Sequence, residues 1–131
     1  MSKRIVLIGH CGPDSSYLRI TVGRAGRDVK VLAADSSSEL DTLLKEGVDL
    51  LLFNRVLDYG FEETSGPVLI GKVRAKHPNV QCMLVSNYPE AQAEAVAAGA
   101  LPGFGKRELG SPRVAEMIRE AIETRAAQKS A

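Results

Sequence analysis

Short runs of apolar residues alternate five times along the chain with stretches in which apolar residues recur every three or four positions. The first run, residues 5–8, is rich in β-branched side chains and contains no polar residue, which is typical of a strand covered on both faces. The third run, centred on Leu50-Leu51-Leu52, is the most apolar and is expected in the middle of the sheet. The pattern predicts strands at residues 5–8, 29–34, 48–53, 80–85 and 101–105.

Capping signals mark the helices between these strands. Pro13 and Pro89 stand at expected first turns, where the missing N–H of proline costs no hydrogen bond. Ser36 and Glu39 form a capping box, in which each side chain accepts a hydrogen bond from a backbone N–H at the start of the helix. After the third strand, residues 54–65 are interpreted as a long polar loop.

The alternation of strands and helices indicates βαβ units with right-handed crossovers and a parallel sheet. Five units are too few for a closed eight-stranded barrel, so we predict an α/β, flavodoxin-like, doubly wound five-stranded parallel sheet of the type (βα)5. The 131 residues suit a single domain, and we assign residues 1–125 to it and residues 126–131 to a polar tail. In such sheets ligands gather beyond the carboxyl ends of the strands.

Composition excludes several classes of protein. The hydrophobic fraction of 44% and the charged fraction of 25% are near the averages for globular proteins, which excludes disordered and fibrous chains. A net charge of +1 and the absence of Trp argue against nucleic-acid binding. No apolar stretch approaches the roughly 20 residues that span a bilayer, and no signal peptide is visible. We therefore expect a cytoplasmic protein that binds neither nucleic acid nor membrane.

Polar residues at three predicted strand ends carry the candidate chemistry. Asn54 follows the run Asp49-Leu50-Leu51-Leu52-Phe53, Ser86 closes the fourth strand, and Lys106 comes just after the fifth. With the order of the elements and Ala98-Gly99-Ala100, this spacing resembles the receiver domain of bacterial response regulators over nearly the whole chain. The resemblance implies two-component signalling and the strand order 2-1-3-4-5.

The resemblance also implies a role for each matching position. Receivers hold Mg²⁺ with a pair of acids after the first strand, and these places fall on Gly9 and His10. The phosphate-accepting aspartate falls on Asn54. The hydroxyl that contacts the phosphoryl group falls on Ser86, and the lysine that pairs with this group falls on Lys106.

Two further family positions are altered. The aromatic switch residue of the fifth strand falls on Gly103, and the proline that follows the lysine falls on Arg107. An amide oxygen is a far weaker nucleophile than a carboxylate, so Asn54 is not expected to form an aspartyl phosphate. Gly9 and His10 are poor ligands for Mg²⁺, which prefers anionic oxygens. We therefore predict a pseudo-receiver that is not an enzyme, needs no cofactor and holds no metal.

The acids that remain near the strand ends allow a second interpretation. Asp14 is either a helix-start acid that interacts with the helix dipole or a substitute acceptor, and Asp58 is either a solvated loop acid or another substitute. With the family's acids lost, Lys106 is expected to face no cluster of negative charge. The loop at residues 54–65 is longer than a receiver's usual connection, and we expect it to reshape or cover the old site.

His10 and Cys11 allow sharper hypotheses. With Asp14 they offer a soft transition-metal site, or Cys11 alone offers a reactive thiol at a strand-to-helix turn. The simpler interpretation is that His10 fills the vacated acidic pocket by a hydrogen bond to Asn54 or Ser86.

Two functions from different classes remain. The first is a signalling module that acts by phosphorylation-independent contact with a protein partner or a second copy. Receivers commonly use the face built from the fourth helix, fifth strand and fifth helix, which here carries charges of both signs. The candidate interface residues on this face are Arg107, Arg113, Glu116 and Arg119. The alternative is a small-ligand binder or enzyme whose strand-end cleft is formed by His10, Cys11, Asn54, Ser86 and Lys106.

Overall fold

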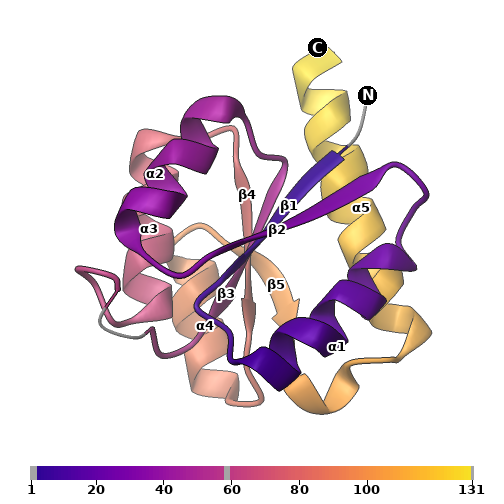
Figure 1. Ribbon diagram of the computed structural model, residues 1–131, viewed down its shortest axis with the longest axis horizontal. Helices are drawn as coiled ribbons and strands as arrows, with labels where there is room; N and C mark the ends of the chain where they lie inside the picture. The colour runs from indigo at the N-terminus through magenta and orange to yellow at the C-terminus, as the bar shows by residue number, and fades with distance from the viewer. Residues whose placement is uncertain (1–2, 58–59, 131) are drawn as a thin grey trace.

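A computed structural model describes residues 3–57 and 60–130, with side chains to residue 123, and shows one parallel sheet flanked by helices (Figure 1). The strand order is β2-β1-β3-β4-β5, as the resemblance implied. The strands are β1 (Lys3–Ile8), β2 (Val29–Ala34), β3 (Leu50–Asn54), β4 (Gln81–Val85) and β5 (Leu101–Phe104). The helices are α1 (Gly12–Gly23), α2 (Ser37–Glu46), α3 (Gly66–Lys76), α4 (Pro89–Ala97), the short 3₁₀ helix η1 (Lys106–Glu108) and α5 (Pro112–Ser130).

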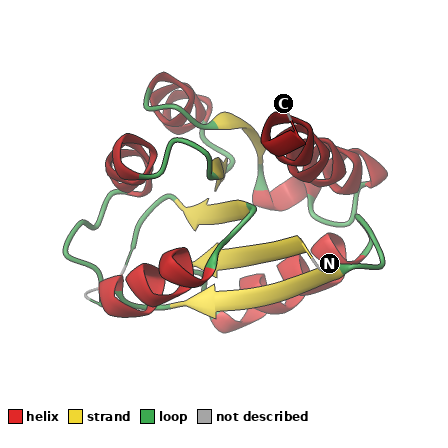
Figure 2. Cartoon of the chain, turned by 90° about the horizontal axis from the view of Figure 1, so that it is seen from above, coloured by secondary structure: helices red, strands yellow, loops and turns green. Residues whose placement is uncertain are grey.

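The helices form two layers, one on each face of the sheet (Figures 1 and 2). Helices α1 and α5 cover one face, where Leu18 and Ile118 belong to one apolar cluster. Helices α2, α3 and α4 cover the other, where Leu40 and Ile70 belong to a second cluster. Strand β3 lies at the centre of the sheet, and its residues 50–53 expose no surface. The prediction that this run forms the middle strand is therefore confirmed.

The strands lie close to their predicted bounds, and the late start of the third strand has a local cause. The third strand was expected from residue 48 but begins at Leu50. A side-chain oxygen of Asp49 accepts a hydrogen bond from the backbone N–H of Arg4 at 2.9 Å. A side chain thus takes a donor of β1 that would otherwise pair with backbone, which shortens the regular ladder.

The predicted capping box at α2 forms with one change of partner. Ser36 Oγ accepts from the backbone N–H of Glu39 at 3.2 Å, as expected. The carboxylate of Glu39 accepts from the backbone N–H of Asp35 at 3.2 Å, one residue before the expected partner. Both ends of the box still satisfy backbone donors at the start of the helix, which keeps β2 and α2 in a defined turn.

Strands β4 and β5 do not pair in regular register. Met83 faces Leu101 and Val85 faces Phe104, so two steps along β4 match three steps along β5. The extra residue makes a β-bulge in the segment that contains Pro102, which has no N–H to give to a ladder. This irregularity shapes the end of β5.

The loop between β3 and α3 is not simply polar, which corrects the sequence prediction. Leu57 is 2% exposed and Phe61 4% exposed, and both belong to the apolar cluster under α2, α3 and α4. The loop is also tied to the start of α2, because Ser37 donates its backbone N–H to the carbonyl of Gly60 at 2.9 Å. Asp58, the loop acid considered above, lies outside the described residues.

Helix α5 begins next to a local cap, where Arg113 donates its backbone N–H to Ser111 Oγ at 3.2 Å. Its backbone continues to Ser130, through most of the segment that the sequence analysis assigned to a tail. Within the part of the chain that the structure describes, no helix is long and apolar enough to cross a membrane.

Candidate functional site

The carboxyl ends of the strands meet at one edge of the sheet, where the structure shows a cleft of about 320 Å³. Three of the predicted site residues line it together: Asn54 from β3, Ser86 after β4 and Lys106 at the start of η1. Gly9 and His10 are not among the residues that line this cleft. The rest of its lining is formed by Arg55, Val56, Val85, Asn87 and Tyr88.

Asn54 uses its amide as a donor to two backbone carbonyls. Its Nδ2 donates to the carbonyl of Gly9 at 3.1 Å and to the carbonyl of Val56 at 3.0 Å. Only an NH₂ group can give both bonds, because carbonyl oxygens accept and never donate. The side chain therefore holds the end of β1 against the loop after β3. A carboxylate at this position would turn both hydrogen bonds into contacts between acceptors.

Gly9, predicted at the first acid position of a receiver, has a backbone conformation and surroundings that disfavour a side chain. Its φ of +70° is in the left-handed region that favours glycine. A Cβ built there would lie 2.5 Å from Cδ2 of Leu57 and 3.6 Å from the ring of Phe61. Apolar side chains from the loop after β3 thus occupy the space beside the end of β1, as the length of that loop suggested.

His10, predicted at the second acid position of a receiver, is buried. Only 8% of it is exposed, and its Nε2 donates to the carbonyl of Leu52 at 2.9 Å. Burial lowers the pKa of the imidazole below its usual value, the hydrogen bond to Leu52 opposes this, and the charge of Lys106 lowers it further. The neutral ring is therefore the form that this site favours near pH 7.

The expected hydrogen bond from His10 to Asn54 or Ser86 is absent. The ring bonds to β3 instead, and Asn54 bonds to backbone carbonyls as described above. Ser86 is 5% exposed, and its Oγ accepts from the backbone N–H of Tyr88 at 3.2 Å. Asn54, Ser86 and Nε2 of His10 thus each bond to a backbone group, whereas Nδ1 of His10 is buried without a hydrogen-bond partner among the described residues.

Lys106 faces one carboxylate, which refines the expectation that it faces no cluster of negative charge. Its Nζ lies 2.9 Å from Oδ2 of Asp14, in the first turn of α1. The Lys106 ammonium holds the pKa of this carboxyl below its usual range, partial burial opposes the effect, and a hydrogen bond with the Cys11 side chain adds to it. Asp14 is thus both a helix-start acid and the ion-pair partner of Lys106.

The residues that the resemblance places at the metal position of receivers do not fit a magnesium ion. Gly9 has no side-chain oxygen, and its Cβ direction is filled by Leu57. His10 uses Nε2 as a donor to Leu52. The thiol of Cys11 is exposed at the N-cap of α1. No group of three His, Cys, Asp or Glu side chains placed to hold a metal occurs among residues 3–57 and 60–123.

Gly103, predicted at the aromatic switch position of receivers, has no space for a side chain. A Cβ built on Gly103 would overlap the carbonyl oxygen of Leu84 and lie 2.8 Å from Oε1 of Gln92. The next residue, Phe104, is aromatic but only 1% exposed, and it packs in the cluster under α1 and α5. Neither Phe104 nor Gln92 was predicted from the sequence to belong to this site; the local signal was the Pro102-Gly103 pair, which is typical of a bulge.

Arg55 and Tyr88 form the rim of the cleft, and the sequence analysis did not single them out. The guanidinium of Arg55 lies 4.6 Å from the centre of the Tyr88 ring, at cation–π distance. The contact joins the loop after β3 to the loop after β4. No local sequence pattern predicts this contact, because 33 positions separate the two residues.

Comparison of the sequence with protein-family models finds no match, and comparison with curated proteins finds none. Solved structures do match. The chain is similar to the signal receiver domain of an HD domain-containing protein from Pseudomonas fluorescens, with a TM-score of 0.81 and 17% identity over 98% of this chain and 93% of that one. It is similar to a putative response regulator from Chloroflexus aurantiacus, with a TM-score of 0.78 and 16% identity over 94% and 99%.

A third similar structure is the beryllofluoride-activated NtrC4 receiver domain dimer, with a TM-score of 0.68 and 14% identity over 93% of this chain and 98% of that one. These structures share the strand order and helical layers described above, although few residues are identical. The chain has the fold of a response-regulator receiver domain.

Proposed function

We propose that this protein is a cytoplasmic bacterial signalling module of the pseudo-receiver type, which acts by protein contact and not by phosphorylation of its own strand-end site. The carrying observation is the side chain of Asn54, whose Nδ2 donates to the carbonyls of Gly9 and Val56. The acceptor position of the family is thus used as a structural link between two loops. The filled space beside Gly9 supports the same conclusion.

The contacts in the cleft do not favour the enzymatic or small-ligand alternative. A nucleophile needs a base within hydrogen-bond reach. Ser86 Oγ accepts from a backbone N–H, and Lys106 is paired with Asp14. His10 is turned toward Leu52. Ser86, Lys106 and His10 are thus bound to structural partners, which supports a non-enzymatic role.

The face built from α4, β5 and α5 remains the proposed contact surface. Its candidate residues differ in whether their charges are already paired within the chain. Arg113 pairs with Glu108 at 2.7 Å, and Arg119 pairs with Glu116 on the same helix. Exposed ion pairs of this kind contribute little to stability. The charges of Arg113 and Arg119 are already balanced by acidic residues of the same chain. Arg107 is exposed, and no ion pair to it is present among the described side chains. We therefore assign Arg107 the leading role in charge recognition.

A hollow of about 320 Å³ lies on this face, and Pro89, Gln92, Arg107 and Glu108 contribute to its lining. One of the similar structures is described as a dimer, so a second copy is a reasonable partner alongside another signalling protein. A two-fold arrangement would bring basic and acidic residues of this face opposite each other.

The first test addresses phosphorylation. The protein is incubated with Mg²⁺ and acetyl phosphate, and separately with beryllofluoride, while the backbone amides of Asn54, Ser86 and Lys106 are followed by NMR. We expect no saturable shift of these amides and no covalent phosphoryl group by mass spectrometry. A stable mass increase of one phosphoryl group on the wild type would overturn the proposal.

The second test addresses the contact surface. We expect Arg107→Glu to weaken self-association, or retention of a co-purifying protein, by about tenfold, since reversal of a charge in a contact costs more than its removal. Arg27→Glu is the matched control, because Arg27 is exposed at the opposite end of the sheet, before β2. Sedimentation and affinity capture measure both variants. Equal behaviour of the two variants and the wild type would remove Arg107 from the interface.

A further inference from the structure

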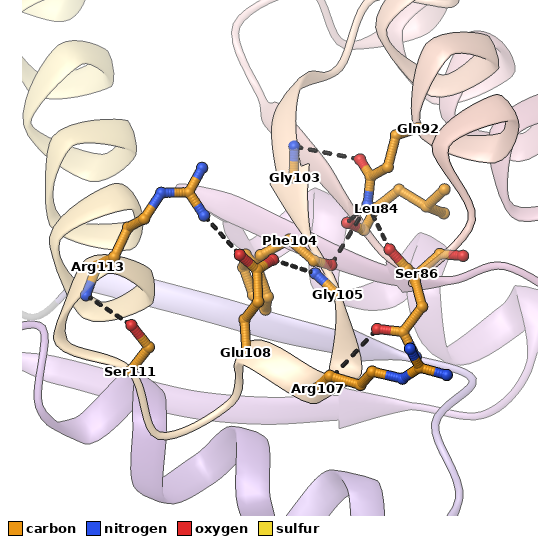
Figure 3. A network of polar contacts seen from close by, with 11 residues as sticks. Leu84, Ser86, Gln92, Gly103, Phe104, Gly105, Arg107, Glu108, Ser111 and Arg113 are labelled. Atoms are coloured by element: carbon orange, nitrogen blue, oxygen red, sulfur yellow. Dashed lines mark hydrogen bonds and ion pairs between the residues drawn. The ribbon is translucent and has the colours of Figure 1, made fainter.

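The side-chain amide of Gln92, on α4, lies between the ends of β4 and β5 (Figure 3). Its Oε1 accepts from the backbone N–H of Gly103 at 3.2 Å. Its Nε2 lies within hydrogen-bond distance of three carbonyl oxygens, those of Leu84 at 2.9 Å, Ser86 at 3.1 Å and Phe104 at 3.3 Å. A single side chain thus connects one helix to two strands.

This arrangement replaces hydrogen bonds that the bulge removes. At the bulge the carbonyl of Leu84 faces Gly103, but the N–H of Gly103 points to Gln92 instead. A primary amide has the same donor and acceptor groups as a peptide unit. Gln92 therefore completes the β4–β5 ladder from outside the sheet. Loss of this amide would leave the N–H of Gly103 without its acceptor, while the carbonyl of Phe104 would keep the hydrogen bond that it accepts from the backbone N–H of Ser86 at 2.9 Å.

A second set of contacts continues from the bulge to α5 (Figure 3). Gly105 donates its backbone N–H to Oε2 of Glu108 at 2.7 Å, and Oε1 of Glu108 accepts from Arg113 at 2.7 Å. The contacts from Gln92 to Arg113 thus cross the whole α4–β5–α5 face. None of them uses the side chain of Asn54 or Lys106.

We propose that Gln92 is a clamp that holds the α4–β5 surface in one fixed conformation, so that this surface is ready for its partner without a signal from the strand-end cleft. The inference rests on the proposed function for its choice of surface, but the clamp itself is a property of the free protein. Helix α4 cannot shift along the sheet without breaking the bonds of Gln92 to both strands. The absence of a side chain at Gly103 leaves room for the amide and is part of the same device.

The primary test is amide hydrogen exchange and NMR relaxation dispersion of the free protein. In Gln92→Ala we expect the Gly103 amide to exchange at least about tenfold faster, because its acceptor is gone. Conformational exchange is expected to appear in residues 84–92 and 101–105. The Glu39 amide, which donates to Ser36 Oγ at the start of α2, serves as an internal reference. Glu94→Gln is the matched control, since Glu94 is exposed on the same helix.

A second variant, Gln92→Glu, keeps a side chain of similar size, so it distinguishes loss of the amide hydrogen bonds from loss of the side chain as a whole. The introduced carboxylate can accept from Gly103 but would face three carbonyl oxygens, so its pKa in the folded protein is expected above the usual value of about 4.3. A group with a raised folded pKa loses its stabilising contribution as pH rises. We therefore expect the variant to approach wild-type stability as the pH falls below about 5 and to weaken toward pH 7, whereas Glu94→Gln shows no such trend. This readout remains available if Gln92→Ala fails to fold.

Unchanged Gly103 exchange and no new dispersion in Gln92→Ala, or no pH trend in Gln92→Glu, would overturn the clamp. Self-association, or retention of the co-purifying protein, is then compared in the same variants by sedimentation and affinity capture. A loosened α4 in Gln92→Ala with binding weakened about tenfold supports both proposals. A loosened α4 with unchanged binding supports the clamp but removes this surface from the proposed function, so the two failures are distinguishable.

Discussion

A Gly103→Tyr variant, which places an aromatic residue at the family's switch position, is expected to lose about 3 kcal/mol or more of its free energy of unfolding. The reason is steric, since φ at Gly103 is not in the left-handed region. Any Cβ there would overlap the carbonyl oxygen of Leu84 and crowd Oε1 of Gln92 at 2.8 Å. The aromatic ring would have to displace the clamp before it could occupy any switch position.

Urea denaturation followed by circular dichroism measures this loss. Gly103→Ala is expected to show a large part of it, because the Cβ itself is the source of the overlap. Gly23→Ala is a suitable control, since a Cβ on Gly23 near the end of α1 meets no atom within 4 Å. Neutral surface changes usually alter stability by less than about 0.5 kcal/mol. If the stability of Gly103→Ala lies within this range of the wild type, a side chain can be accommodated at this position of β5.

An Asn54→Asp variant is the simplest attempt to restore phosphorylation, and we expect it to fail. The new carboxylate would face the carbonyl oxygens of Gly9 and Val56 where the amide now donates to both. The two lost hydrogen bonds and the acceptor contacts should cost about 1–3 kcal/mol at pH 7. The cost should decrease as the pH falls and the carboxyl becomes protonated, since its folded pKa is raised by these oxygens.

The variant is tested with Mg²⁺ and acetyl phosphate by mass spectrometry, alongside urea denaturation. Asn87→Asp is a matched control at the same cleft, because the side chain of Asn87 acts as an acceptor there, from the backbone N–H of Arg107 at 3.1 Å. A carboxylate can keep that role, so this control is expected to remain near wild-type stability. Efficient phosphorylation of Asn54→Asp would contradict our interpretation of the acceptor position.

Much of the fold follows from local sequence signals. Residues 29–34 form β2 as the pattern predicted, and Ser36 caps α2 because its hydroxyl reaches the N–H of Glu39 within the same turn. The run at residues 50–53 was expected at the centre of the sheet and lies there with no exposed surface. These predictions hold because the responsible contacts join residues close in sequence, or depend only on how apolar a strand is.

The candidate site was predictable only in outline. Asn54, Ser86 and Lys106 were expected to meet because parallel strands end at the same edge of the sheet, and they line one cleft. Their partners were not predictable. Lys106 pairs with Asp14 across 92 positions of sequence, and His10 reaches the backbone of Leu52 across 42. The burial of Leu57 in a loop that was interpreted as polar also depends on contacts with distant elements.

By itself, the sequence determined the order of the elements and the parallel sheet, and its resemblance to receiver domains led us to predict that the acceptor, metal-binding and switch residues are replaced. Only the tertiary structure decided what the replacements do: Asn54 joins two loops, Gly9 is covered by Leu57, and Gly103 leaves room for the amide of Gln92. The physical reason is that hydrophobic periodicity and capping are local properties of the chain. The partner of a buried polar group is set by which distant backbone atoms the fold brings within about 3 Å of it.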